Sequence, residues 1–197
     1  VEVLSGEMEA KYGYDGAMCE ISEKEGIYVD IGGASTEIVL FCDGHLQKAG
    51  SVPLGSLKLY RECVRNIIPG KGSQKRIRRK IRTAFTDDAI VNLPAESTMV
   101  CTGGTARAML NLCQKLYDLP ESQRSVSSSQ LAGLVSFLKQ ADHETAVFLL
   151  RYEPARIHTL IPGIMILHYL SMKYQVNEIT VSHYGVREGY LLNRIHV

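Results

Sequence analysis

The residues best suited to chemistry in this chain are two carboxylates separated by a turn of small residues. Asp30 lies in the apolar run Ile27 to Ile31, where a buried strand favours valine or isoleucine, and Glu37 follows seven residues later. Between them, Gly32 and Gly33 allow the backbone to turn tightly and to point N–H groups toward an anion. Carboxylates beside a bound anion are typical of a site that holds a metal ion or activates a water molecule. The pattern predicts a phosphate loop between two strands.

A simpler explanation of this turn is a plain hairpin, in which glycine supplies positive φ angles. The aspartate before the turn and Ser35-Thr36-Glu37 after it favour a site, because a hairpin requires neither. The sequence contains neither the Gly-x-x-x-x-Gly-Lys-Ser/Thr motif of a P-loop nor a Gly-x-Gly-x-x-Gly motif opening a helix. These absences argue against a P-loop nucleotidase and against a dinucleotide site.

Composition predicts an ordinary globular protein. The chain has 197 residues, of which 45% are hydrophobic and 22% charged, and its formal net charge is +1. This balance does not indicate a membrane or a specific nucleic acid as a partner, and there is no apolar run of about 18 residues or more. Five scattered cysteines without a Cys-x-x-Cys pair are typical of reduced thiols, so a cytoplasmic location is expected. The chain begins with Val1 rather than methionine, so we expect a fragment or an excised domain.

The elements that must position the carboxylates are predicted by periodicity and turn signals. Ser5 is expected to cap a first helix, and Pro162 to begin a later one at its first position. The expected helices are Gly6 to about Ala17, Gly55 to about Ile67, Ser73 to about Ala89, Ala106 to Leu116, Gln130 to Ala141, Thr145 to Leu150, one from Pro162, and one opening at Gly185–Gly189. The expected strands are Ile27–Ile31, one through Glu37 to Leu40, Gln47–Pro53 after the Asp43-Gly44 turn, Ser97–Cys101 and Glu178–Ser182. A meander followed by alternating strands and helices predicts an α/β domain with a mixed five-stranded sheet and helices on both faces.

A second small-residue turn, Gly103-Gly104-Thr105, stands where a strand is expected to pass into a helix. Backbone amides at a helix N-terminus can bind an anion, so this turn is a second candidate phosphate site. It can equally be a tight turn with Thr105 as the helix cap, and the two interpretations are compatible.

The most basic segment runs from Lys71 to Arg82, with seven cations and no acid. On a helix, Lys75, Arg78, Arg79 and Arg82 fall on one face and Ile77 and Ile81 on another. The basic face is a candidate polyanion-binding surface, although a face that is merely solvated also fits.

Several sequence blocks, taken in order, resemble the exopolyphosphatase and guanosine pentaphosphate phosphohydrolase family. They are Ser5–Lys11, Asp30–Glu37, Pro53–Ser56, Gly103–Ala108, Pro162-Gly163 with Ile166-Leu167, and Gly185–Gly189. The resemblance implies a ribonuclease-H-like, actin-like ATPase domain. It further implies that residues 1–197 form a single domain, the second of a two-domain enzyme whose first domain is absent here and would be its partner.

The same resemblance implies an activity and roles for residues. The implied reaction is hydrolysis of the terminal phosphoanhydride bond of inorganic polyphosphate or guanosine pentaphosphate by water with Mg2+. Glu9 corresponds to the general base, and Asp30 and Glu37 to the acidic residues that place metal and water. The resemblance also implies a backbone contact of Gly32 to phosphate, with Ser35 and Thr36 as further donors. The two glycine turns add Gly33, Gly103, Gly104 and Thr105 as candidate phosphate-binding residues. The family usually has a third glycine where this chain has Ala34, which could narrow the approach of substrate.

Other functions remain compatible with the sequence. The chain could be a phosphate or nucleotide sensor without turnover, or an actin-like ATPase, because fold alone does not fix function. Glu9 could be an ordinary solvated helix residue. A second copy of the chain, forming a homodimer, is a further candidate partner.

Overall fold

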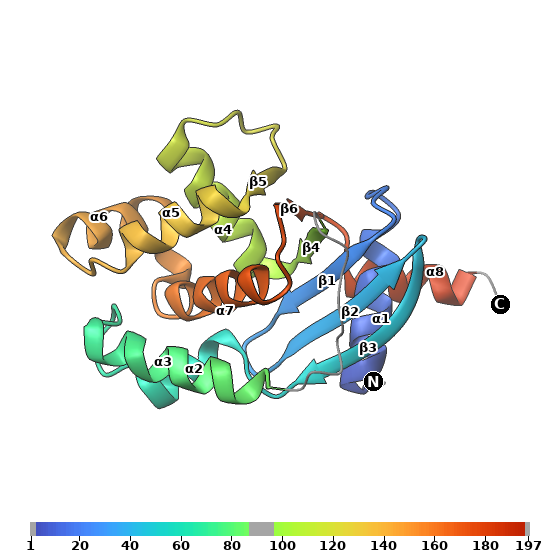
Figure 1. Ribbon diagram of the computed structural model, residues 1–197, viewed down its shortest axis with the longest axis horizontal. Coiled ribbons are helices and arrows are strands. Elements are labelled where there is room, and N and C mark those ends of the chain that lie inside the picture. The colour runs from blue at the N-terminus through green and yellow to red at the C-terminus, as the bar shows by residue number, and fades with distance from the viewer. Residues whose placement is uncertain (1–2, 87–96, 196–197) are drawn as a thin grey trace.

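The computed structural model describes residues 3–86 and 97–195, and the described residues form a six-stranded mixed sheet (Figure 1). The strand order is β3-β2-β1-β4-β6-β5. The strands are β1 (Gly26–Ile31), β2 (Thr36–Cys42), β3 (His45–Val52), β4 (Thr98–Thr102), β5 (Ser125–Ser127) and β6 (Glu178–Val181). Strands β1, β2 and β3 form an antiparallel meander, while β4 runs parallel to both β1 and β6.

Helices cover both faces of the sheet, as the sequence predicts. They are α1 (Gly6–Ala17), α2 (Ser56–Cys63), α3 (Lys71–Ala84), α4 (Gly103–Tyr117), α5 (Ser128–Leu138), α6 (His143–Tyr152), the 3-10 turn η1 (Pro154–Arg156), α7 (Leu160–Lys173) and α8 (Val186–Ile195). None of the helices in the described ranges is long and apolar enough to cross a membrane.

The sheet has a hydrophobic core on each face because side chains alternate along a strand. Ile27 and Val29 of β1 belong to the large core, together with residues of α2, α3, α4, α5 and α7. Tyr28 of β1 and Val39 of β2 belong to a smaller core with Ala10, Tyr14 and Ala17 of α1. The same alternation places Asp30 and Glu37 on the α1 face of the sheet, which decides which helix they meet.

Helix α1 is held on this face by a very close crossing with α8. A Cβ added at Gly189 would overlap the carbonyl oxygen of Tyr12, and one added at Gly16 would overlap the carbonyl oxygen of Gly185. Glycine at both positions therefore lets the two backbones approach, and α8 fixes the position of α1 over the sheet.

The prediction of five strands is wrong, because the sheet has a sixth, β5. Ser125–Ser127 pairs antiparallel with β6 at the sheet edge, and Val126 is its one apolar residue. Three residues carry too little alternation to signal a strand, and serines are also common helix caps. Ser127 serves both elements, because it ends β5 and caps α5 through a capping box with Gln130.

Some element boundaries also differ from the expected ones. Helix α7 begins at Leu160 and not at Pro162, which is tolerated in the first turn because N–H groups there have no intrahelical partner. Helix α2 ends at Cys63, earlier than the expected Ile67, and α3 begins at Lys71, earlier than the expected Ser73. The part of the expected α3 from residue 87 to 89 lies outside the described residues.

Candidate active site

Asp30 and Glu37 are brought together by the register of the first hairpin. They are direct cross-strand partners in the antiparallel β1–β2 pair, so their Cα atoms face each other across the ladder. Both side chains lie on the α1 face. Glu37 is only 6% exposed, and its Oε1 accepts a hydrogen bond of 2.8 Å from the Oγ of Ser51. Two carboxylates seven residues apart thus become neighbours.

Helix α1 brings Glu9 to the same place. Ser5 caps the helix by accepting a 3.2 Å hydrogen bond from the N–H of Met8, as predicted. Gly6 lies so close to β3 that an added Cβ would overlap Ser51. Burial, followed by the negative charge of Glu37, raises the pKa of Glu9 above its usual value. Ser51 also donates to Glu37, so the first turn of α1 lies beside Glu37 and the three predicted acids share one region of the α1 face.

Asp30 has a raised pKa because it is buried beside another carboxylate. Burial and then the charge of Glu37 raise its pKa to about 6, against the opposing effects of a Thr102 hydrogen bond and the Arg107 cation. Thr102 is the partner of Asp30 on β4, and its Oγ1 lies 2.7 Å from the buried hydroxyl of Tyr28. Burial and the charge of Glu37 disfavour the ionised form of Asp30, so a bound cation would stabilise that form.

The carboxylates of the site can be compared with the ligands that Mg2+ usually takes. Among the described residues, the three carboxylates do not converge within 4.8 Å as a set, and the cluster that does is Glu25, Cys42 and Asp43 at a distant hairpin. Asp30 and Glu37 instead form a pair. Mg2+ is commonly bound by one or two carboxylates together with waters and substrate phosphates, so this pair fits it.

The first glycine loop, residues 32–35, is held in shape by its own backbone and by α2. The Gly32 N–H donates to the Ser35 carbonyl (3.0 Å), and the Gly32 carbonyl accepts from the N–H (2.9 Å) and Oγ (3.0 Å) of Ser56. A Cβ at Gly55 would lie 2.6 Å from the Gly32 oxygen, so α2 starts directly against the loop. The hydroxyl of Thr36 is buried and donates to the Leu54 carbonyl (2.6 Å), so it supports the loop from behind.

This arrangement decides which groups of the loop can meet a ligand. Gly33 and Ala34 are exposed, and in the described part of the chain their N–H groups donate to no backbone acceptor. The N–H of Gly32 and the hydroxyl of Thr36 are already engaged. The polar groups of the loop that are open to a ligand are therefore those of Gly33, Ala34 and the partly exposed Ser35.

The second loop opens α4 and meets Asp30 directly. Gly103 has a φ of +79°, and an added Cβ would overlap the Oδ1 of Asp30. Glycine is thus required there both for backbone conformation and for close approach. Thr105 is buried and donates to the Ile31 carbonyl (3.2 Å), which ties the two loops together. The amides that begin α4 lie beside the carboxylates, where a helix N-terminus favours an anion.

Two residues of the site escaped the sequence reasoning. Ser51 could have been found, because it is the β3 partner of Glu37 in the meander register. Arg156 follows α6 in η1 and gives no sequence signal, yet a Cβ at Gly104 would overlap its guanidinium group. Arg156 therefore joins Arg107 as a cation near the start of α4.

The basic helix has the two faces that the sequence predicts. Ile77 and Ile81 are buried, while Lys75, Arg78, Arg79 and Arg82 are exposed. Helix α3 packs against α2 and α7 and contributes no residue to the carboxylate site described above. The basic face and the carboxylates are thus separate surfaces.

Replacing Asp30 with asparagine is expected to alter stability in a pH-dependent way. Because the folded-state pKa of about 6 lies above the ordinary 3.8, the contribution of Asp30 to stability is present below about pH 4 and is lost as pH rises through 6. Chemical denaturation in EDTA should find Asp30→Asn more stable than wild type at pH 8, by up to about 3 kcal/mol, with the difference vanishing at pH 4. A constant difference between the two proteins across this range would contradict the assignment.

A mixed sheet that begins with an antiparallel meander, with two glycine turns beside paired carboxylates, is the architecture of an actin-like α/β domain. A sequence model of the Ppx/GppA phosphatase family matches residues 1–197, and the chain belongs to this family. The resemblance carried by the sequence blocks is therefore confirmed.

Individual relatives agree with this membership. The chain is 25% identical over 203 residues to Exopolyphosphatase 2 of Mycobacterium tuberculosis, covering 98% of this chain and 63% of that protein. Its identity to Exopolyphosphatase 1 of Mycobacterium leprae is 22% over 173 residues, covering 86% and 51%. The chain thus spans less than two thirds of the length of these relatives.

Solved structures share the fold. The Aquifex aeolicus PPX-GPPA enzyme matches with a TM-score of 0.80 at 24% identity, covering 98% of this chain and 65% of that one. An exopolyphosphatase from Cytophaga hutchinsonii matches with a TM-score of 0.82 at 18% identity, covering 100% and 65%.

Proposed function

We propose that this chain provides the acidic part of an active site that hydrolyses terminal phosphoanhydride bonds of inorganic polyphosphate or guanosine pentaphosphate. The observation that carries the proposal is the cross-strand pair Asp30 and Glu37, which lies beside the opening of α4 and is joined by Glu9 from α1. Membership of a phosphatase family supports the reaction class, and the names of the relatives support polyphosphate as a substrate.

The chemistry requires charge neutralisation and a positioned water more than covalent help. Asp30 and Glu37 would hold Mg2+, which neutralises phosphate charge when it is bound. The amides of the first loop and of the α4 N-terminus would bind the terminal phosphate, with Arg107 and Arg156 near the second of these groups. Glu9 would accept the proton of the attacking water, and its raised pKa makes it a better base than an exposed glutamate.

The complete site is proposed to need a second domain. The chain covers 63% of Exopolyphosphatase 2, and an anion bound beside Asp30 needs a facing wall to exclude water. We therefore infer that residues 1–197 form the second actin-like domain of a two-domain enzyme, and that this domain alone hydrolyses little.

The direct test is phosphate release by the two-domain protein, with and without Mg2+, from polyphosphate and guanosine pentaphosphate at matched concentrations of terminal phosphate. Mg2+-dependent release from either substrate is expected. Binding without release would indicate a sensor domain, and a preference for ATP over both substrates would indicate an actin-like ATPase. Comparing the two turnover rates identifies the better substrate.

The basic face of α3 is proposed to hold the distal part of a polyphosphate chain. Replacing Lys75 and Arg79 together with alanine should weaken binding of long polyphosphate roughly tenfold at low salt, because two exposed charge interactions are lost. Isothermal titration at two salt concentrations measures this effect. Tripolyphosphate should bind as before, and so should long chains to the control variant Lys24→Ala. Equal weakening for short and long chains would place this face at the terminal phosphate instead.

A further inference from the structure

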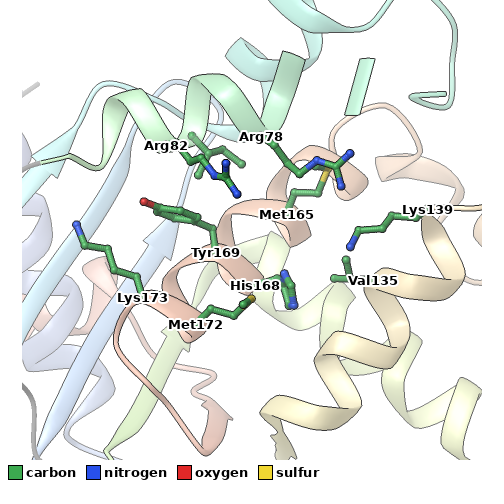
Figure 2. A pocket seen from close by; sticks show the side chains of 10 residues that line it. Arg78, Arg82, Val135, Lys139, Met165, His168, Tyr169, Met172 and Lys173 are labelled. Atoms are coloured by element: carbon green, nitrogen blue, oxygen red, sulfur yellow. The ribbon is translucent and has the colours of Figure 1, made fainter. Parts of the chain in front are cut away.

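A pocket that is partly open to solvent lies between α3, α5 and α7. It is a cavity of about 370 Å3, and it contains none of the carboxylates described above (Figure 2). Arg78 and Arg82 line it from α3, Lys139 from the end of α5, and Lys173 from the end of α7. Four cations from three helices therefore surround one space.

Among the described residues, these charges have no acidic partner. No carboxylate is among the residues that line the cavity, and within the described ranges none of the four cations forms an ion pair with an acid. Lys173 donates to the Phe85 carbonyl, a neutral partner (2.6 Å). Burial and the charge of Lys139 lower the pKa of His168, which also lines the cavity. A cluster of this kind attracts an anion.

The walls are not merely cationic. Ile81, Val135 and Met165 are buried and contribute apolar surface, and the thioether of Met172 lies at the exposed side. The ring of Tyr169 completes the wall and packs against Phe85, with the ring centroids 6.1 Å apart. An inorganic anion gains no binding energy from contact with apolar and aromatic side chains, so the wall favours an organic ligand. Sites for small organic ligands combine apolar surface with a few polar groups and occupy about 300–1,000 Å3, so this cavity falls within their range.

We propose that this cavity binds an organic phosphate with a planar aromatic ring, of the class of nucleoside monophosphates. The phosphate would meet Arg82 and Lys139, and the planar ring would lie against Tyr169 and the methionines. No residue of the carboxylate site lines the cavity, so the proposal does not depend on hydrolysis there, although Arg78 and Arg82 also belong to the basic face of α3.

Helix α7 joins this cavity to the catalytic loops. Its C-terminal half lines the cavity. Gly163, in its N-terminal half, packs against Thr105 and Ser56, the two residues that hydrogen-bond to the carbonyls of Ile31 and Gly32. A Cβ at Gly163 would lie 2.5 Å from the Cγ2 of Thr105 and 3.3 Å from the Cβ of Ser56. A ligand in the cavity would thus contact the same helix that touches the starts of α2 and α4.

The test is isothermal titration of the protein with adenosine 5′-monophosphate, adenosine and inorganic phosphate as probes. The nucleotide should bind, and adenosine and phosphate should each bind at least about tenfold more weakly because each fills half of the site. Lys139→Ala should weaken nucleotide binding about tenfold by removing a charge-assisted contact, and Met172→Glu should weaken it at least as much. Met172 is 67% exposed, so the second substitution should leave the fold intact.

Two control variants test whether a loss of binding is specific to this cavity. Lys24→Ala removes an exposed cation far from the cavity and should not change nucleotide affinity. Glu9→Gln alters the proposed catalytic base and should also leave nucleotide affinity unchanged, whether or not hydrolysis proves to be the function. No nucleotide binding, binding that is insensitive to both cavity substitutions, or inorganic phosphate binding as tightly as the nucleotide would overturn the proposal.

Discussion

Replacing Glu9 with glutamine is expected to lower the turnover number of the two-domain enzyme by about 10²- to 10⁴-fold, the usual contribution of a general base. The amide keeps the shape of the side chain and cannot accept the proton of the attacking water. Substrate affinity should change little, because Glu9 is proposed to act on water and not on phosphate. Initial rates of phosphate release over a range of substrate concentrations separate the two parameters.

Glu7 offers a matched control on the same helix. It lies two residues earlier, is exposed, and also stands in the first turn of α1. Glu7→Gln therefore changes the charge of α1 by the same amount without touching the site, and near wild-type turnover is expected. If Glu9→Gln retained full turnover, or if Glu7→Gln lost as much, Glu9 would not be the base.

The second large effect is expected from Gly103→Ala. A Cβ at this position would overlap the Oδ1 of Asp30, so either the α4 N-terminus or the carboxylate must move. Misplacement of a reacting group by about 1 Å can cost about 100-fold in rate, and we expect a loss of that size or more. The variant should also be less stable, by about 1–2 kcal/mol, because alanine is strained at a φ of +79°. Rates of phosphate release and chemical denaturation measure the two effects.

Gly44→Ala separates strain from contact. Gly44 has a φ of +74°, but an added Cβ there would have no atom within 4 Å. It should show a similar loss of stability with nearly normal turnover. If both variants lost activity equally, general destabilisation would explain the result, and the contact with Asp30 would play no special part.

Most elements of the fold could be predicted because their signals are local. Helix α1 occupies the predicted residues, with Ser5 as its cap. The turn between β2 and β3 lies at Asp43 and Gly44, where both residues have positive φ, as the Asp-Gly signal predicts. The sequence does not predict strand β5, because its pairing with β6 joins segments about 50 residues apart. The strand also contains only one apolar residue, which is too few for a recognisable alternation.

The candidate site could be predicted in part for the same reason. Asp30 and Glu37 stand out in sequence as charges in apolar surroundings, and the hairpin that joins them is local. The approach of Glu9 to Glu37 depends on the packing of α1, and its role came from the family resemblance alone. Arg156 could not be found, because only the packing of η1 against α4 brings it to Gly104.

By itself, the sequence determined the α/β class, the two glycine turns, the acids beside them and the two faces of α3, because these features depend on residues close together in the chain. Only the tertiary structure decided that α8 fixes α1 over the carboxylates and that the Gly32 amide and the Thr36 hydroxyl support the loop. It also decided that cations from three helices surround one cavity. These arrangements arise from contacts between distant segments, which form only when the helices pack against the sheet.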